Sequence, residues 1–155
     1  ADVEDGLADA SKHGEIAVSH DLCPGVRVVS GSRDAVAAFQ VPGAVLTETD
    51  ARQGAHSPLA ADAAAAYDAL LVRALAGAAE LAPPLHVAAP AGGVVATDAA
   101  AAGDALRGSL GRPVAWRAAM ERLLAAGATH FVDAGGGAQL RAFGERCGAG
   151  EWLWY

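Results

Sequence analysis

The stretch Gly54-Ala55-His56-Ser57-Pro58-Leu59 divides the chain into two differently patterned parts. Before it, short β-branched runs alternate with glycine and proline, a pattern that predicts strands and tight turns. After it, apolar residues recur at helical spacing up to about Ala78, and proline at position 58 suits the first turn of a helix. We therefore expect a small α+β unit at residues 1–54 and a second, α/β part at residues 55–155.

The first part has the order helix, strand, strand, helix, strand. Acids near its start favour a helix amino terminus, β-branched runs favour strands, and Ser32 can cap a helix. The expected elements are a helix at Ala1–Ser11, strands at Glu15–Ser19 and Val26–Ser30 joined through Pro24-Gly25, a helix at Arg33–Phe39 and a strand at Ala44–Thr47. This is the order of a ferredoxin-like layer without its first strand.

The second part alternates helices with short apolar strands. The expected elements are the long helix after Ser57, a strand at Leu85–Ala88, a helix at Asp98–Arg107 capped by Thr97, a helix at Val114–Ala126 stopped by Gly127, a buried strand at His130–Val132 and a helix at Leu140–Cys147. Such alternation predicts βαβ units and a mostly parallel sheet.

Composition excludes several classes of protein. The chain has 155 residues, enough for one domain or for one domain with a small appendage. Its formal net charge of -7, from 11 basic and 18 acidic side chains, leaves no basic stripe of the kind that binds nucleic acid. We find no apolar run of membrane-spanning length and no secretory signal pattern. Two cysteines without a paired motif fit a reducing compartment, so we expect ordinary thiols in a cytoplasmic protein.

Histidine is the residue type best suited to acid-base work here, because its pKa lies near neutrality. His56 ends a loop and immediately precedes a helix, where a base can be held in a fixed position. We interpret the other four histidines as structural or surface residues: His13, His20, His86 and His130.

Four blocks of sequence carry a resemblance to a known family. The segment around His56 is similar to the active-site histidine segment of the malonyl-CoA:acyl carrier protein transacylases, which include the acyltransferase domains of polyketide and fatty acid synthases. The other blocks follow in family order: Cys23-Pro24-Gly25 with Val28–Gly31, then Arg112–Trp116, then Phe131–Gly137. Together they extend over about residues 1 to 148.

The resemblance implies an α/β-hydrolase-like core with a ferredoxin-like subdomain, and a ping-pong transfer of malonyl or a substituted malonyl group. A serine takes the acyl group from coenzyme A and passes it to the phosphopantetheine thiol of an acyl carrier protein. Carried over residue by residue, His56 is the catalytic base, Gly54 and Ala55 line the substrate pocket, and a backbone carbonyl near Ala115 orients the His56 ring. No metal and no bound cofactor are implied.

The chain departs from the family pattern in several ways. We find no Gly-His-Ser-x-Gly nucleophile elbow, and Gly108-Ser109-Leu110-Gly111 lacks the leading strand and first glycine that an elbow requires. The residue before the histidine is Ala55 where malonyl-selective members often have phenylalanine, which favours an acyl group larger than malonyl. Ala88 and Gly136 also replace a polar residue and a proline, and we interpret Gly135-Gly136-Gly137 as a strand-to-helix turn.

These departures predict that the chain is the carboxyl-terminal half of an acyltransferase and is incomplete and inactive alone. It starts without methionine and inside an expected helix, which favours a piece of something longer. We expect its partners to be the missing amino-terminal half, acyl-CoA and an acyl carrier protein.

An alternative function is a non-catalytic docking or scaffold module within a polyketide or fatty acid synthase. The net acidic charge opposes binding to an acidic carrier protein unless basic residues such as Arg27 and Arg33 cluster locally.

Overall fold

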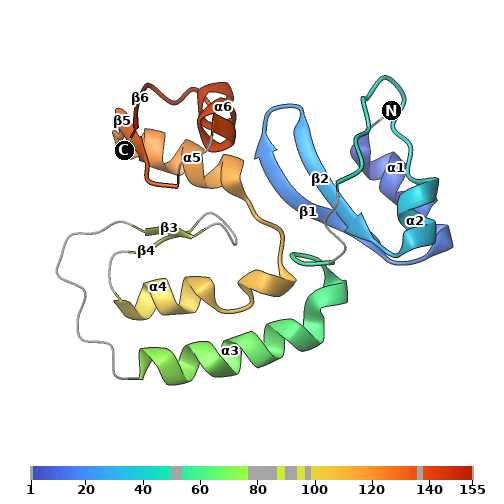
Figure 1. Cartoon of the computed structure of the whole chain (residues 1–155), viewed down its shortest axis with the longest axis horizontal. Coiled ribbons are helices and arrows are strands. Elements are labelled where there is room, and N and C mark those ends of the chain that lie inside the picture. The colour runs from blue at the N-terminus through green and yellow to red at the C-terminus, as the bar shows by residue number, and fades with distance from the viewer. Residues whose placement is uncertain are drawn as a thin grey trace.

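The computed structural model describes residues 2–49, 54–76, 87–89, 94–96, 99–135 and 138–154. Its elements are mixed helix and strand, and they form two groups that meet along one strand of a hairpin (Figure 1). Within these residues, every helix is too short or too polar to cross a membrane.

The first group is a β-hairpin covered by short helices. Its elements are α1 (Val3–Ala10), the 3-10 helix η1 (Ser11–His13), β1 (Ile16–Cys23), β2 (Val26–Gly31) and α2 (Arg33–Ala38). A capping box of Asp2 and Asp5 starts α1, and the Ser32 hydroxyl accepts a hydrogen bond from the Ala35 amide at the start of α2. β1 pairs antiparallel with β2 across the Pro24-Gly25 turn, where Gly25 has a φ of 77°. The expected helices, strands and turn are therefore present here, with β1 longer than expected.

The strand expected at Ala44–Thr47 is wrong. The structure has no strand between residues 39 and 49, and Val45 is 94% exposed. A strand needs a neighbour to satisfy its backbone groups, and no strand lies beside this segment in the described part of the chain. The expected third strand of a ferredoxin-like layer is thus missing from the described residues.

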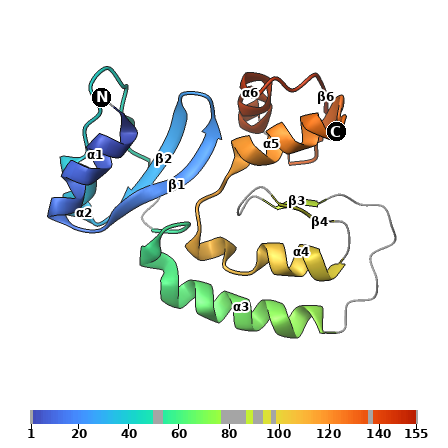
Figure 2. The ribbon, with the colours of Figure 1, turned by 180° about the vertical axis from the view of Figure 1, so that it is seen from behind.

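The second group stacks helices on either side of small strand pairs. Its elements are η2 (Pro58–Ala60), α3 (Ala61–Leu75), β3 (Val87–Ala89), β4 (Val94–Ala96), α4 (Ala99–Leu106), η3 (Ser109–Gly111), α5 (Trp116–Ala125), β5 (His130–Asp133), α6 (Ala138–Arg146) and β6 (Glu151–Trp154). β3 and β4 contact α4 on one side and α5 on the other, and α3 lies against α4 (Figures 1 and 2). Residues Leu85, His86 and Thr97 of the expected strand and cap lie outside the described residues.

The expected mostly parallel sheet is also wrong for the described residues. They contain three separate two-stranded sheets, and only β5–β6 is parallel. β4 and β6 were not expected from the sequence, because each is very short. β5 is half exposed where a buried strand was expected, with Val132 54% exposed.

Helix α5 begins two residues later than expected. Val114 instead forms a parallel β-bridge with His20 of β1. The Val114 amide donates to the Ser19 carbonyl and the Val114 carbonyl accepts from the Asp21 amide, both at 2.8 Å. A residue held in an extended bridge cannot also start a helix. Gly127 ends the helix as predicted, with a φ of 92°.

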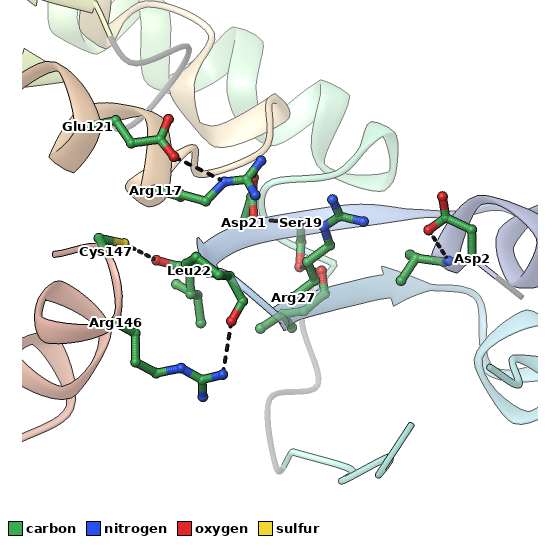
Figure 3. A network of polar contacts seen from close by, with 12 residues as sticks. Asp2, Ser19, Asp21, Leu22, Arg27, Arg117, Glu121, Arg146 and Cys147 are labelled. Atoms are coloured by element: carbon green, nitrogen blue, oxygen red, sulfur yellow. Dashed lines mark hydrogen bonds and ion pairs between the residues drawn. The ribbon is translucent and has the colours of Figure 1, made fainter. Parts of the chain in front are cut away.

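The core is thin because alanine dominates it. Buried apolar residues are mostly small, and Phe39 and Met120 are the largest among them. Polar side chains of α5 and α6 therefore help to hold the hairpin in place (Figure 3). Arg117 of α5 pairs with Asp21 at 3.1 Å, and Arg146 of α6 donates to the Pro24 carbonyl at 2.9 Å. The Cys147 thiol, a free thiol like Cys23, donates weakly to the Leu22 carbonyl.

Close packing of α6 on β6 makes a specific prediction about Gly144. A Cβ at this position would clash with the ring of Trp152, which is stacked on Phe131. We expect Gly144→Ala to lower the free energy of unfolding by about 1–2 kcal/mol, since overpacking outweighs the helix propensity of alanine. Urea unfolding measures this change in the free energy of unfolding. The control Gln139→Ala, exposed in the same helix, should change stability by less than about 0.5 kcal/mol.

Candidate functional site

His56 sits in a tight loop that the rest of the chain holds firmly. It is the only non-glycine residue with positive φ in the described residues, at 60°. Such a backbone conformation is unfavourable for a side chain with a Cβ, and the surrounding contacts must enforce it. Two of these contacts come from η3: the His56 amide donates to the Leu110 carbonyl at 2.8 Å, and the His56 ring nitrogen Nδ1 lies 2.9 Å from the Ser109 carbonyl.

The residues beside His56 keep the loop narrow. Ser57 is 1% exposed and its hydroxyl donates to the Gly54 carbonyl, closing the loop on itself. A Cβ on Gly54 would lie 2.9 Å from the Cβ of Leu59, so glycine is required for this close approach. Pro58 then begins η2, as its ring allows at a helix start.

The 3-10 turn that holds His56 is itself anchored by α3. Gly108 precedes η3 in a left-handed conformation, with a φ of 68°. Its amide donates to both carboxylate oxygens of Asp68, at 2.8 and 3.1 Å. A charged acceptor makes this a strong hydrogen bond. Asp68 therefore holds η3 in place, and η3 in turn holds His56.

The orienting carbonyl is that of Ser109, where the sequence analysis expected one near Ala115. Ala115 caps α5, and its carbonyl accepts a hydrogen bond from the Ala119 amide at 3.0 Å. That carbonyl is committed to the first turn of the helix. The Ser109 carbonyl accepts from the Arg112 amide at 3.4 Å as well as from the His56 ring, since a carbonyl oxygen has two lone pairs.

This hydrogen bond fixes which nitrogen of His56 carries a proton. A carbonyl oxygen only accepts, so Nδ1 must donate and Nε2 is left with its lone pair. A neutral histidine held in this form can take a proton at Nε2.

A shallow hollow lies directly beside the His56 loop. Its volume is ≈ 240 Å³, and only glycine, alanine and leucine residues line it. It contains both pocket positions expected from the sequence together with residues of η2, α3 and η3, as follows: Gly54, Ala55, Leu59, Ala60, Ala63 and Leu110. The hollow is thus an apolar space beside the loop that carries His56.

His20 is the residue of this site that the sequence analysis missed. Its ring centroid lies 5.1 Å from that of His56, with the two planes at 73°. Burial lowers the pKa of His20 below its ordinary value, and the neighbouring His56 ring lowers it further. Thirty-five residues of chain separate the two histidines, so no local pattern could have paired them.

The other sequence candidates lie away from this site. His13 is exposed in η1, and His130 is exposed in β5 with Glu151 3.4 Å away. Ser109 follows a helix and not a strand, so it does not stand on a nucleophile elbow. Ala88 lies in β3, whereas His86, Gly136 and Gly137 lie outside the described residues. No group of three or more potential metal ligands occurs in the part of the chain that the structure describes.

Basic side chains gather near the hairpin turn. Arg27 and Arg117 both lie against Asp21, at 3.8 and 3.1 Å, and Arg146 reaches the turn from α6 (Figure 3). Arg33 starts α2 beyond the other end of β2. Of the two arginines singled out from the sequence, only Arg27 belongs to this cluster.

Solved structures that match this chain include malonyl-CoA:acyl carrier protein transacylases. The malonyl-CoA:acyl carrier protein transacylase of Xanthomonas oryzae pv. oryzae KACC10331 is 25% identical, with a TM-score of 0.81 over 98% of this chain and 49% of its own. The transacylase of Coxiella burnetii is 21% identical, with a TM-score of 0.83 over 98% and 49%. A malonyl transacylase solved with its type II polyketide synthase acyl carrier protein is 18% identical, with a TM-score of 0.81 over 99% and 50%.

The chain spans about half the length of these transacylases, with nearly all of its own residues matched. No protein-family model and no curated protein sequence matches it. The resemblance drawn from four sequence blocks is therefore confirmed by the fold, at half length.

The hydrogen bond between Asp68 and Gly108 can be tested directly. We expect Asp68→Ala to lower the free energy of unfolding by about 1–2 kcal/mol, because the half-buried amide of Gly108 loses a charged acceptor. The change should also shift the imidazole NMR signals of His56, which η3 positions. Asp104→Ala is the matched control: this exposed residue pairs with Arg107 at 3.5 Å, and its loss should cost less than about 1 kcal/mol. Unchanged His56 NMR signals in Asp68→Ala would contradict the claim that Asp68 positions His56 through η3.

Proposed function

We propose that this chain is one half of an acyltransferase that moves a malonyl or substituted malonyl group from coenzyme A to the phosphopantetheine thiol of an acyl carrier protein. The observation that carries the proposal is the His56 geometry: a ring with Nδ1 on the Ser109 carbonyl and Nε2 free, beside an apolar hollow. The fold at half length and the sequence blocks support the same reaction class.

In the proposed reaction, His56 acts as the general base for a serine that the complementary half supplies. Nε2 of His56 takes the hydroxyl proton while the serine oxygen attacks the thioester carbonyl. The tetrahedral intermediate collapses, the C–S bond breaks, and the departing coenzyme A thiolate takes the proton back from His56. The same steps in reverse then move the acyl group to the thiol of the carrier protein.

The Ser109 carbonyl has a distinct part in this scheme. When Nε2 gains the proton, the ring becomes a cation, and Nδ1 still donates to the carbonyl oxygen 2.9 Å away. It also holds the tautomer on which the base function depends. No side-chain carboxylate is needed for this orientation.

Exposed apolar surface supports the proposal that a further protein segment covers this chain. A second apolar hollow of ≈ 260 Å³ lies between α5, β5 and β6. Val132 and Leu153 lie on the same strands and are about half exposed. Apolar surface gathered at one place in this way is typical of a protein–protein interface.

A docking module without catalysis is the alternative. The arginines near the hairpin turn could meet an acidic carrier protein, and a relative in the comparison was solved with its carrier protein. Docking alone would not require a histidine held in one tautomer. NMR titration with a carrier protein, repeated with His56→Ala, separates docking from transfer.

The first prediction from this proposal concerns His56. We expect acyl transfer to appear when the chain is mixed with a complementary half that carries a Gly-His-Ser-x-Gly segment, and His56→Ala to lower its rate by at least about 100-fold. Radiolabelled malonyl-CoA and a carrier protein measure it. The chain alone should acquire no label.

Ser109→Ala serves as the control, because only its backbone carbonyl is used, and this variant should retain activity. Full activity in His56→Ala would reject the assigned role, and labelling of the isolated chain at Ser109 would reject the need for a second half.

The second prediction concerns acyl specificity at position 55. Ala55 lines the hollow, so Ala55→Phe should fill it and select against a substituent on carbon two of the acyl group. We expect the ratio of kcat/KM for malonyl-CoA over methylmalonyl-CoA to rise by roughly 10-fold or more. Competition between the two thioesters measures the ratio. Ala63→Ser is the control, because Ala63 also lines the hollow but serine adds little volume, so the ratio should change less. An unchanged ratio in Ala55→Phe would reject the pocket assignment.

A further inference from the structure

Two histidine rings meet at the candidate site, one of which has no role in the proposed reaction. His20 comes from β1 and His56 from the loop before η2, and their ring centroids are 5.1 Å apart at 73°. This is an edge-to-face arrangement, which is favourable between aromatic rings. His20 therefore contacts the His56 ring, whose Nε2 must keep its direction for the proposed reaction.

The His20 side chain is held rigidly. Its Nδ1 lies 3.0 Å from the hydroxyl oxygen of Ser19, a residue with no exposed surface. The Ser19 hydroxyl donates its own proton to the Val28 carbonyl at 3.2 Å, so it can only accept from His20. His20 is thus protonated at Nδ1 and bare at Nε2 when neutral, the same tautomer as His56.

The backbones of the two histidines are tied to one segment. His56 is hydrogen-bonded to Ser109 and Leu110. A few residues later, Val114 bridges His20 through hydrogen bonds to Ser19 and Asp21. The segment from 109 to 114 therefore sets the distance between the rings, and the contact is a consequence of the fold.

We propose that His20 is a positioning residue for His56: its neutral ring packs on the His56 imidazole and keeps Nε2 aimed at the reacting hydroxyl, and its protonation opposes the reaction. This inference rests on the proposed function. No motif in the sequence singles out His20.

The reaction itself explains why the second ring must be neutral. His56 becomes a cation when it accepts the serine proton, and a second cation 5.1 Å away would raise the energy of that state. Burial and the neighbouring His56 both lower the pKa of His20, which keeps it neutral at physiological pH.

The other charged groups nearby are occupied elsewhere. On β1, Asp21 is turned toward Arg27 and toward Arg117 of α5. On the side of η3, the Asp68 carboxylate holds the Gly108 amide, and the Arg112 side chain lies over Gly108. Within the described residues, His56 is the titratable group found to act on His20.

The first arm of the test uses NMR of the chain with labelled histidine, and it needs no activity. Both rings should show the Nδ1-protonated tautomer. Replacing His56 by Gln should raise the titration midpoint of His20, since the neighbouring positive charge is removed. His13→Gln, an exposed change in η1, is the matched control and should leave that midpoint unchanged. An unchanged His20 midpoint in His56→Gln would overturn the coupling.

The second arm measures transfer in the reconstituted enzyme. We expect His20→Ala to lower kcat by roughly 10- to 100-fold with little change in KM, because the base is displaced while acyl-CoA still binds. His20→Phe keeps a ring and cannot be charged, so it should retain most of the activity near about pH 8 and lose less than wild type near about pH 5.5. A merely structural role would not produce this difference in pH profile.

The outcomes separate the inference from the proposed function. A kcat for His20→Ala equal to that of His13→Gln, in a folded protein, overturns the positioning role. Equal acid limbs for wild type and His20→Phe overturn the charge effect. Should the reconstituted wild type transfer no acyl group, the proposed function fails, and the NMR arm still decides whether the two rings are coupled.

Discussion

The site depends on one physical constraint: the clamp of the His56 loop onto the single turn of η3. Two hydrogen bonds to adjacent carbonyls, from the His56 amide and from Nδ1, hold backbone and ring together. They offset the unfavourable left-handed conformation of His56 and select its tautomer. Without η3, neither the direction of Nε2 nor the hollow beside Ala55 would be defined.

The clamp has its own supports, and they come from both groups of elements. Asp68 of α3 fixes the start of η3 through the Gly108 amide. After η3, Val114 is bound into the edge of β1, which also carries His20 to the His56 ring. The hairpin is in turn held by Arg117 and Arg146 from the carboxyl-terminal helices. Because the core is thin and rich in alanine, these polar contacts help to hold the two groups of elements together.

One strand expected from the sequence did not form because it has no neighbouring strand in the described residues. Ala44–Thr47 has the composition of a strand, yet Val45 is 94% exposed, since nothing pairs with it in the described residues. The short pairs β3–β4 and β5–β6 form only where a second strand lies beside the first. A strand is a property of two segments, and its partner cannot be found from the local pattern.

By itself the sequence determined the features that depend on local chemistry. These include the helix after Pro58, the Ser32 cap, the Pro24-Gly25 turn, the Gly127 stop, and His56 as the candidate base at the head of a helix. The tertiary structure decided what depends on distant residues. It replaced Ala115 by Ser109 as the source of the orienting carbonyl, because the His56 loop is hydrogen-bonded to η3 and not to the start of α5. It also brought His20 to His56, since the bridge from Val114 to β1 joins segments that are far apart in the chain.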